Sequence, residues 1–330
     1  MNNDKQINVA YFGSPEISAS LLQELMQNLH INIKLVITQE DRPFGKKLEI
    51  TACPVKKTAS ENNIEVFDFK LKNHVHELID KISLHNIQLG ILFAYGAIIP
   101  DILLKSFKYG ILNVHPSLLP KYRGASPTAF PFIMGEKTSG VSLMVLNTQL
   151  DEGPIIKQVK INISETSSIN SRVELEKNIP SISIKQIDET LKDILNNTFS
   201  MKNQDHSAAT YTRLLKKQDG YIDTKLIKKA IKGELILNKE ELPEIIKWYL
   251  FKNNILSFEP VLASHVVMNM QKGLSPWPDI WTTFKTPRNE IKRIKIFECS
   301  IKDECLIIEA LQIEGKNKIK YKDFIKAYSL

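Results

Sequence analysis

Short apolar runs alternate with amphipathic helical patterns through the first half of the sequence, and this alternation constrains the fold more than any other feature. Residues 7–12 and 33–38 are strand-like, and between them Ile17, Leu21 and Leu25 recur at the spacing of one helix face. Further strand-like runs follow at residues 64–67, 89–96, 111–115, 141–146 and 155–161. Strands that alternate with helices in this way predict an α/β domain with a doubly wound, Rossmann-like and largely parallel sheet.

The pattern changes in the last part of the chain. From residue 273 onward the apolar runs are short, strand-like and separated by turns, which is typical of a small, OB-like β-barrel. The total of 330 residues is long for one domain and comfortable for two. We therefore predict a first domain over residues 1–205, a linker over 206–223 and a C-terminal domain over 224–330.

The net charge of +7 arises in the C-terminal part of the chain. Residues 1–210 contain 22 of the 44 Lys and Arg residues and 22 of the 37 Asp and Glu residues, which leaves 22 basic and 15 acidic residues for 211–330. A basic domain attached to a neutral one indicates a polyanionic partner. A compositional bias towards lysine explains the excess equally well, because the chain has 38 Lys and 6 Arg. Charge alone leaves both interpretations open.

Several common kinds of site lack their sequence signatures. The 13 glycines form neither a G-x-G pattern nor a P-loop, which argues against a dinucleotide or a P-loop nucleotide. Cys53, Cys299 and Cys305 have no C-x-x-C spacing, so neither a disulfide framework nor a metal site is predicted. No run approaches the roughly 20 apolar residues that span a bilayer, and no signal-peptide core is found, so we expect a cytoplasmic protein.

The candidate site is built on residues 110–124, which read GILNVHPSLLPKYRG. Asn113 and His115 are two residues apart at the end of a predicted strand, so their side chains share one face. Ligands bind at such strand ends in open α/β sheets. Asp151 follows another predicted strand and is expected at a neighbouring strand end. An amide donor beside an imidazole that a carboxylate orients suits the attack of a nucleophile on a carbonyl carbon.

A purely structural role for the same residues is also open at this point. Asn113 and His115 could satisfy backbone groups in the turn after a strand, and Asp151 could cap a turn or a helix. If the site is catalytic, the absence of a G-x-S-x-G motif favours direct transfer over a covalent intermediate.

Two segments resemble a known family. The sequence NVHPSLLPKYRGASP at residues 113–127 resembles the signature of folate-dependent formyltransferases, and LDEGP at 150–154 resembles the segment that carries the family's aspartate. Within that family the chain is similar to the branch that acts on methionyl-initiator tRNA in translation initiation. The features that favour this branch are FGSPE at 12–16, the loop at 39–47, WP at 277–278 and EGK at 314–316.

The resemblance implies a reaction and a set of site residues. A formyl group would pass from 10-formyltetrahydrofolate to the methionyl amino group, with Asn113 stabilising the oxyanion, His115 assisting proton transfer and Asp151 orienting the groups. The folate site would be lined by Ser117, Leu118, Leu119, Pro120, Phe93, Ala94, Tyr95 and Gly96. The tRNA acceptor stem would be contacted by Arg42, Lys46 and Lys47, and tRNA phosphates by basic residues of the C-terminal domain. The family-level expectation is a monomer without a metal.

Three departures from the family pattern accompany the resemblance. Gln149 stands where a glycine commonly precedes the Leu-Asp pair, and the loop at 39–47 is one or two residues shorter than usual. Residues 224–272 are longer than expected, which makes them a candidate insertion. Two alternative functions remain at this stage: a formyltransferase that acts on a small amine, such as an amino sugar or glycinamide ribonucleotide, and a tRNA-binding relative without catalysis.

Overall fold

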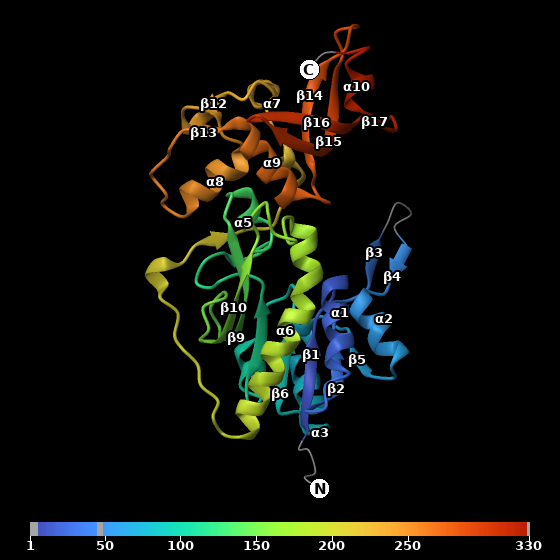
Figure 1. Ribbon diagram of the computed structural model, residues 1–330. Helices are drawn as coiled ribbons and strands as arrows, with labels where there is room; N and C mark the ends of the chain where they lie inside the picture. The colour runs from blue at the N-terminus through green and yellow to red at the C-terminus, as the bar shows by residue number, and fades with distance from the viewer. Residues whose placement is uncertain (1–5, 45–48, 329–330) are drawn as a thin grey trace. The chain divides into compact units, whose positions relative to one another are not determined.

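The computed structural model of the protein describes residues 6–44 and 49–328, and the chain divides into two compact units. The first unit consists of Met1–Arg123, Gly140–Ile161 and Glu176–Ala209. The second unit consists of Gly124–Ser139, Asn162–Leu175 and Thr210–Leu330. Two short excursions, residues 124–139 and 162–175, therefore belong with the C-terminal part (Figure 1). The domain boundaries at residues 205 and 224 remain predictions.

A single sheet organises the first unit. Among the described residues it has seven strands in the order β10-β9-β7-β6-β1-β2-β5. The pairs β1–β2, β1–β6, β2–β5 and β6–β7 are parallel, and β7–β9 is antiparallel. In sheet order, the strands are β10 (Ile155–Asn162), β9 (Thr138–Val145), β7 (Ile111–His115), β6 (Leu89–Leu92), β1 (Ile7–Phe12), β2 (Ile31–Ile37) and β5 (Glu65–Phe67).

Helices cover both faces of this sheet. Ala10 and Phe12 of β1 belong to a buried cluster with Leu78 of α3, whereas the hydroxyl of Tyr11 donates to the carbonyl of Ser18 in α1, 2.8 Å away. Because neighbouring strand residues point to opposite faces, α3 and α1 lie on opposite sides of the sheet. The helices that accompany the sheet are α1 (Glu16–Leu25), α2 (Pro54–Glu61), α3 (Leu71–Leu84), α4 (Asp101–Leu104) and α6 (Arg172–Leu195).

Part of the polar segment predicted as a loop at 39–47 is a strand, and residues 45–47 of that segment lie outside the described residues. Strand β3 (Arg42–Phe44) pairs with the antiparallel strand β4 (Glu49–Thr51). Helix α2 then begins at Pro54, where the fixed φ of proline suits the first helical position. The sulfur of Cys53 accepts a hydrogen bond from the backbone of Lys56 and caps this helix.

The second unit combines a helical part with an antiparallel sheet. The helical part contains α7 (Thr224–Ile231), β12 (Leu235–Ile236), α8 (Glu244–Lys252), β13 (Val261–Leu262) and α9 (Ala263–Leu274). Helix α9 contacts α7 and also β15, so residues 224–272 share a core with the sheet. Whether they are an insertion remains a prediction. The excursions add α5 (Phe130–Ile133), which contacts α9. Strand β8 (Arg123–Gly124), where the chain passes from the first unit to the second, pairs with β11 (Tyr211–Thr212).

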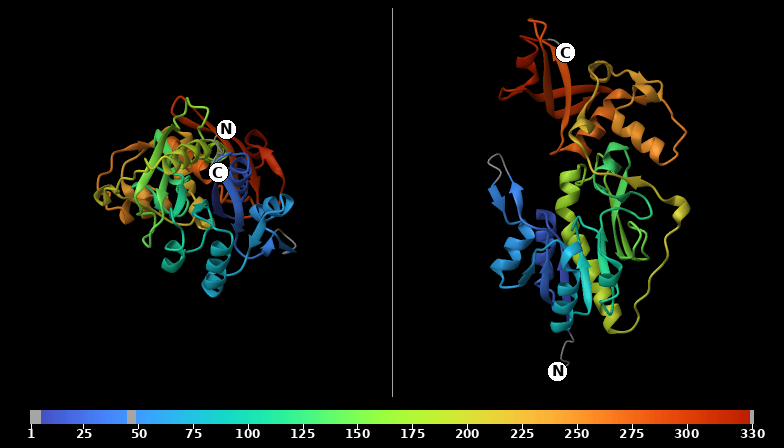
Figure 2. Two further views of the ribbon diagram at one scale, coloured as in Figure 1. Left: turned by 90° about the horizontal axis from the view of Figure 1, so that it is seen from below. Right: turned by 180° about the vertical axis from the view of Figure 1, so that it is seen from behind.

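The antiparallel sheet follows the order of its strands in the sequence. It runs β14-β15-β16-β17, and α10 (Tyr321–Phe324) contacts β16 and β17 (Figures 1 and 2). The strands are β14 (Ile280–Lys285), β15 (Ile291–Lys302), β16 (Cys305–Ile313) and β17 (Lys318–Lys320). The prediction of an α/β fold with a largely parallel sheet is confirmed, and the part predicted to be a small, OB-like β-barrel contains this four-stranded antiparallel sheet. None of the helices in the described residues has the length and apolarity needed to cross a membrane.

Candidate active site

Strand β7 carries the two central side chains of the candidate site. Its apolar residues Ile111, Leu112 and Val114 are buried, which fixes the strand between β6 and β9. Asn113 and His115 are also buried, with 7% and 4% of their surface exposed. Because they are two residues apart in a strand, they project from the same face, as the sequence predicted.

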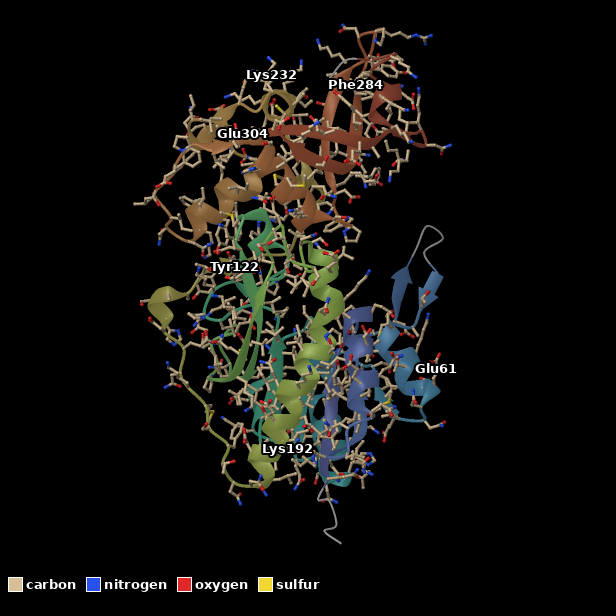
Figure 3. The ribbon with its side chains drawn as sticks, in the orientation of Figure 1. Glu61, Tyr122, Lys192, Lys232, Phe284 and Glu304 are labelled. Atoms are coloured by element: carbon tan, nitrogen blue, oxygen red, sulfur yellow. The ribbon has the colours of Figure 1, made fainter. Side chains whose placement is uncertain are left out.

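The imidazole of His115 has a partner at each nitrogen. Its Nε2 atom lies 3.0 Å from the backbone carbonyl oxygen of Tyr122, a residue labelled in Figure 3. Its Nδ1 atom lies 3.6 Å from a carboxylate oxygen of Asp151. A carbonyl oxygen can only accept, so Nε2 must carry a hydrogen. Nδ1 is therefore the ring position that can take up and return a proton, and it faces the Asp151 carboxylate.

Asp151 reaches His115 by a route that the sequence did not predict. Strand β9 runs antiparallel to β7, so its last residue, Val145, pairs with Leu112 rather than with the end of β7. The connection from 146 to 154, and not the alignment of strand ends, brings Asp151 to the imidazole. The expected pairing of His115 with a carboxylate is present, but the reasoning from neighbouring parallel strand ends was wrong.

The turn that carries Asp151 accommodates Gln149 without strain. Asp151 itself has the positive φ of the turn, 53°, a conformation that Asp adopts more readily than most residues. Gln149 has no positive φ, and its backbone N–H donates to the side-chain oxygen of Asn147 at 3.0 Å. The backbone therefore does not require a glycine at position 149.

The amide of Asn113 is available to a ligand. Within the described part of the chain, its side chain makes no hydrogen bond, although the residue is 7% exposed. Its nitrogen and oxygen are not among the fully buried side-chain atoms that lack a partner, so water or a ligand can reach them. An amide NH₂ group in this situation is suited to donate to an oxygen on which negative charge develops.

The turn at residues 93–96 alternates buried aromatic residues with exposed small ones. Phe93 and Tyr95 are each 2% exposed, whereas Ala94 and Gly96 are exposed and have φ values of 52° and 76°. Burial raises the pKa of Tyr95 to about 12, and its backbone carbonyl accepts a hydrogen bond from Gln39. Because Ala94 and Gly96 are small and exposed, their backbone atoms next to the end of β6 are accessible to a planar ligand.

The turn after β7 is held by internal hydrogen bonds. The hydroxyl of Ser117 donates to the carbonyl of Lys121, and the hydroxyl of Ser142 donates to the carbonyl of Ser117. Ser117 and Leu119 are buried, whereas Leu118 and Pro120 are half-buried. Of the four residues of this turn that were predicted to line the folate site, Leu118 and Pro120 are therefore the two whose side chains reach the surface.

The residues predicted to contact tRNA lie mostly outside what the structure describes. Arg42 is the first residue of β3, and Lys46 and Lys47 lie outside the described residues.

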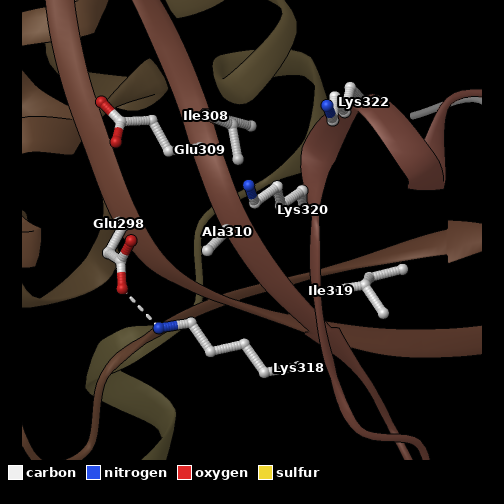
Figure 4. Close-up of a pocket in the computed structure, with 8 residues that line it drawn as sticks. All are labelled: Glu298, Ile308, Glu309, Ala310, Lys318, Ile319, Lys320 and Lys322. Carbon is white, nitrogen blue, oxygen red and sulfur yellow. Dashed lines mark hydrogen bonds and ion pairs between the residues drawn. The ribbon is translucent and has the colours of Figure 1, made fainter.

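A pocket of about 560 Å³ lies in the second unit and does not involve the residues above. Figure 4 shows that its lining combines Glu298, which pairs with Lys318, with the lysines Lys320 and Lys322 of β17 and α10. With Glu309 included, the lining has three lysines and two glutamates, a net charge of +1.

Sequence reasoning missed a buried arginine beside the site. Arg123 is fully buried, and its guanidinium contacts the side chains of Glu152 and Gln204. Arg123 belongs to the motif at 110–124, and its place in the same motif as Asn113 and His115 could have indicated a role in the site. No sequence signal pointed to Gln204, because it lies in an irregular segment 81 residues from Arg123.

Comparisons with known proteins agree with this geometry. The profile of the formyl transferase family matches residues 5–179. The methionyl-tRNA formyltransferase of Caldicellulosiruptor saccharolyticus is 28% identical over 345 residues, which cover 98% of this chain and 98% of the relative.

Two solved structures have a similar fold. An N-formyltransferase from Helicobacter canadensis, in complex with folinic acid and dTDP-3-aminofucose, has a TM-score of 0.56 at 17% identity and covers 90% of this chain and 89% of its own. The methionyl-tRNA formyltransferase from Clostridium thermocellum has a TM-score of 0.50 at 14% identity, with coverage of 93% and 98%. The family profile spans the sheet together with Asn113, His115 and Asp151. The chain belongs to the formyl transferase family.

Proposed function

We propose that the protein is a methionyl-tRNA formyltransferase. It transfers a formyl group from 10-formyltetrahydrofolate to the α-amino group of methionyl-initiator tRNA. The observation that carries the proposal is the extent of the similarity: the methionyl-tRNA formyltransferase of C. saccharolyticus matches 98% of this chain, so the likeness includes the second, basic unit as well as the first. The expected setting is the cytoplasm, with the enzyme acting as a monomer.

The side chains of the first unit suit direct attack by the amine. The amine nitrogen bonds to the formyl carbon, and the bond from that carbon to the donor nitrogen breaks. In this mechanism the Asn113 amide donates to the oxygen that becomes negative as the amine adds. His115 Nδ1 takes a proton from the attacking amine and returns it to the departing nitrogen, so protons balance over the reaction. Asp151 stabilises the charged ring, since its carboxylate lies 3.6 Å from that atom.

The surfaces near these residues fit a folate. Folate supplies the formyl group, and its pterin is a flat ring that needs apolar walls and a few polar contacts. The exposed backbone at Ala94 and Gly96 and the half-buried side chains of Leu118 and Pro120 meet that need. Phe93, Tyr95, Ser117 and Leu119 would support the two turns from within, because all four are buried.

The charge distribution supports a polyanionic substrate. Residues 211–330 contain 22 basic and 15 acidic residues, and Arg42 lies in the β3–β4 strand pairing of the first unit. In this proposal Arg42, Lys46 and Lys47 contact the acceptor stem. Lysines of the second unit contact phosphates without reading sequence.

One assay separates this function from its alternatives. Purified protein is incubated with formyl-folate and aminoacylated initiator tRNA, and in parallel with glycinamide ribonucleotide or an amino-sugar nucleotide in place of tRNA. We expect formyl-methionyl-tRNA to form and the small amines to remain unmodified. Turnover of a small amine without tRNA would replace the proposal by a small-amine formyltransferase, and tRNA binding without product would identify a non-catalytic relative.

A further inference from the structure

We infer that Arg123 and Gln204 position the His115–Asp151 pair for proton transfer. The two residues are called the Arg123–Gln204 clamp below. This inference rests on the function proposed above, and it assigns a positioning role to two side chains outside the sets proposed to contact folate or tRNA.

Arg123 is a buried charge with a specific set of acceptors. Its side chain is fully buried, and the Oε1 atom of Gln204 accepts from both Nε and Nη2 at 3.1 and 2.8 Å. Its Nη1 atom lies 2.8 Å from a carboxylate oxygen of Glu152, and its Nη2 atom lies 3.2 Å from Nδ1 of His206. Removing a guanidinium from water is costly, so it is tolerated only when its donors are matched this closely. Moving the guanidinium away from these acceptors would leave a buried charge unpaired, which is unfavourable.

Gln204 transmits this constraint to the turn that carries Asp151. Its Nε2 group donates to the backbone carbonyls of Asp151 and Gly153, at 2.8 Å in each case. Both ends of the amide are therefore occupied, the oxygen by Arg123 and the nitrogen by the turn. Gln204 is 6% exposed, so water does not compete well for these bonds.

Arg123 also constrains the other side of the imidazole. It directly follows Tyr122, whose carbonyl oxygen receives the Nε2–H of His115. Tyr122 is buried and has a φ of 62°, an unusual conformation that needs support from its neighbours. Both groups that hold the imidazole, the Tyr122 carbonyl and the Asp151 carboxylate, are therefore next to atoms that the Arg123–Gln204 clamp fixes.

A purely structural clamp would attach the segment at 204–206 to the sheet and do nothing else. The two roles differ in what they predict. Loss of attachment lowers stability, whereas loss of positioning lowers turnover and changes its pH dependence, because the proton-transfer geometry changes. Among the described residues, Glu152 and His206 are titratable groups that contact Arg123, and Asp151 is a titratable group that faces His115.

Gln204→Glu separates the two roles. The new carboxylate keeps an acceptor for Arg123, so attachment survives, but it repels the carbonyls of Asp151 and Gly153. We expect kcat with methionyl-tRNA to fall by about 10-fold to 100-fold, with near-unchanged KM values for both substrates and an altered pH profile of kcat. The free energy of unfolding in urea should fall less than in Gln204→Leu, because the retained pairing with Arg123 offsets part of the repulsion from the two carbonyls.

Gln186→Glu is the matched control. Gln186 is a buried glutamine of α6 whose Nε2 group donates to the carbonyl of Val141, and within the described part of the chain it makes no hydrogen bond to Tyr122 or Asp151, the residues that hold the His115 imidazole. This variant should lose stability while its kcat and pH profile stay those of the wild type. Gln204→Leu, which removes both sets of bonds, should lose stability and turnover together.

The outcomes also distinguish this inference from the proposed function. If the wild type does not formylate methionyl-tRNA, the proposed function fails. If the wild type is active and folded Gln204→Glu keeps wild-type kcat and pH profile, the positioning role fails and the proposed function stands.

Discussion

The carbonyl oxygen of Val145 occupies the place where a side chain at Gly153 would begin. A Cβ atom built on Gly153 would lie 1.8 Å from that oxygen, far inside any van der Waals separation. Gly153 therefore lets the turn after Asp151 return closely against the end of β9. We expect Gly153→Ala to cost about 3 kcal/mol or more in the free energy of unfolding, measured in urea, and to lower turnover as well.

A second glycine serves as the control. Gly315 has a φ of 78°, but a Cβ there would meet nothing within 4 Å. Gly315→Ala should cost about 1 kcal/mol, from backbone conformation alone, and leave turnover unchanged. Equal losses of stability in the two variants would show that the close approach at Gly153 is not the decisive constraint.

Asn113→Ala tests the oxyanion donor. If the amide stabilises developing charge, its removal should lower kcat by about 10²-fold to 10³-fold. Folate binding, followed by the quenching of protein fluorescence, should change little, because the amide acts on the transition state. Near-wild-type turnover in a folded Asn113→Ala protein would remove Asn113 from the mechanism.

Glu65 links stability to pH at the edge of the parallel sheet. Its carboxylate accepts a hydrogen bond from Lys81, which lowers its pKa; partial burial opposes this effect, and a bond to His85 adds to it. A lowered pKa in the folded state means that the contribution is present above the ordinary pKa of about 4.3 and is lost as pH falls through the lowered value. Glu65→Gln should therefore reduce the free energy of unfolding at neutral pH.

The pH series gives the check on that assignment. The difference between wild type and Glu65→Gln should shrink as the solution becomes more acidic than the lowered pKa. It should be small throughout, since the three side chains remain partly exposed to solvent. A difference that persists unchanged in acid would point to packing rather than charge.

Lysines around the pocket of the second unit should contribute to tRNA binding through charge. Lys320 and Lys322 lie at the junction of β17 and α10. Replacing both with Gln should raise KM for tRNA and flatten its dependence on salt, by about 0.9 in the logarithmic slope for each phosphate that is no longer neutralised. Lys192→Gln, a charge change of the same sign in α6 of the first unit, should leave the slope unchanged. Identical slopes in all three proteins would exclude this surface.

The sequence was most informative where a local pattern determines the structure. The alternation of apolar runs predicted the α/β sheet, and the period of two in a strand placed Asn113 and His115 on one face. It could not predict the direction of β9, because an apolar run has the same pattern in a parallel and an antiparallel strand. That is why Asp151 was expected at a strand end rather than on a returning turn.

Interactions made by backbone atoms, or by residues far apart in the chain, could not be predicted from the sequence. The partner of His115 Nε2 is a carbonyl oxygen of Tyr122, and every residue has such an oxygen. Gln204 acts through bonds to residues between 51 and 81 positions away, which no local pattern records. The polar stretch at 39–47 was interpreted as a loop because hairpin pairing depends on Glu49 and its neighbours, which come after it.

The position of Gln204 has a consequence for dividing the protein into working parts. A fragment cut after α6, at Leu195, would keep every strand of the parallel sheet and the whole segment that matches the family profile. It would nevertheless leave the guanidinium of Arg123 without the amide that accepts from it at two atoms. The C-terminal limit of a stable fragment of the first unit is therefore set by Gln204, which lies in an irregular segment. The ends of helices and strands alone do not show where the chain can be cut.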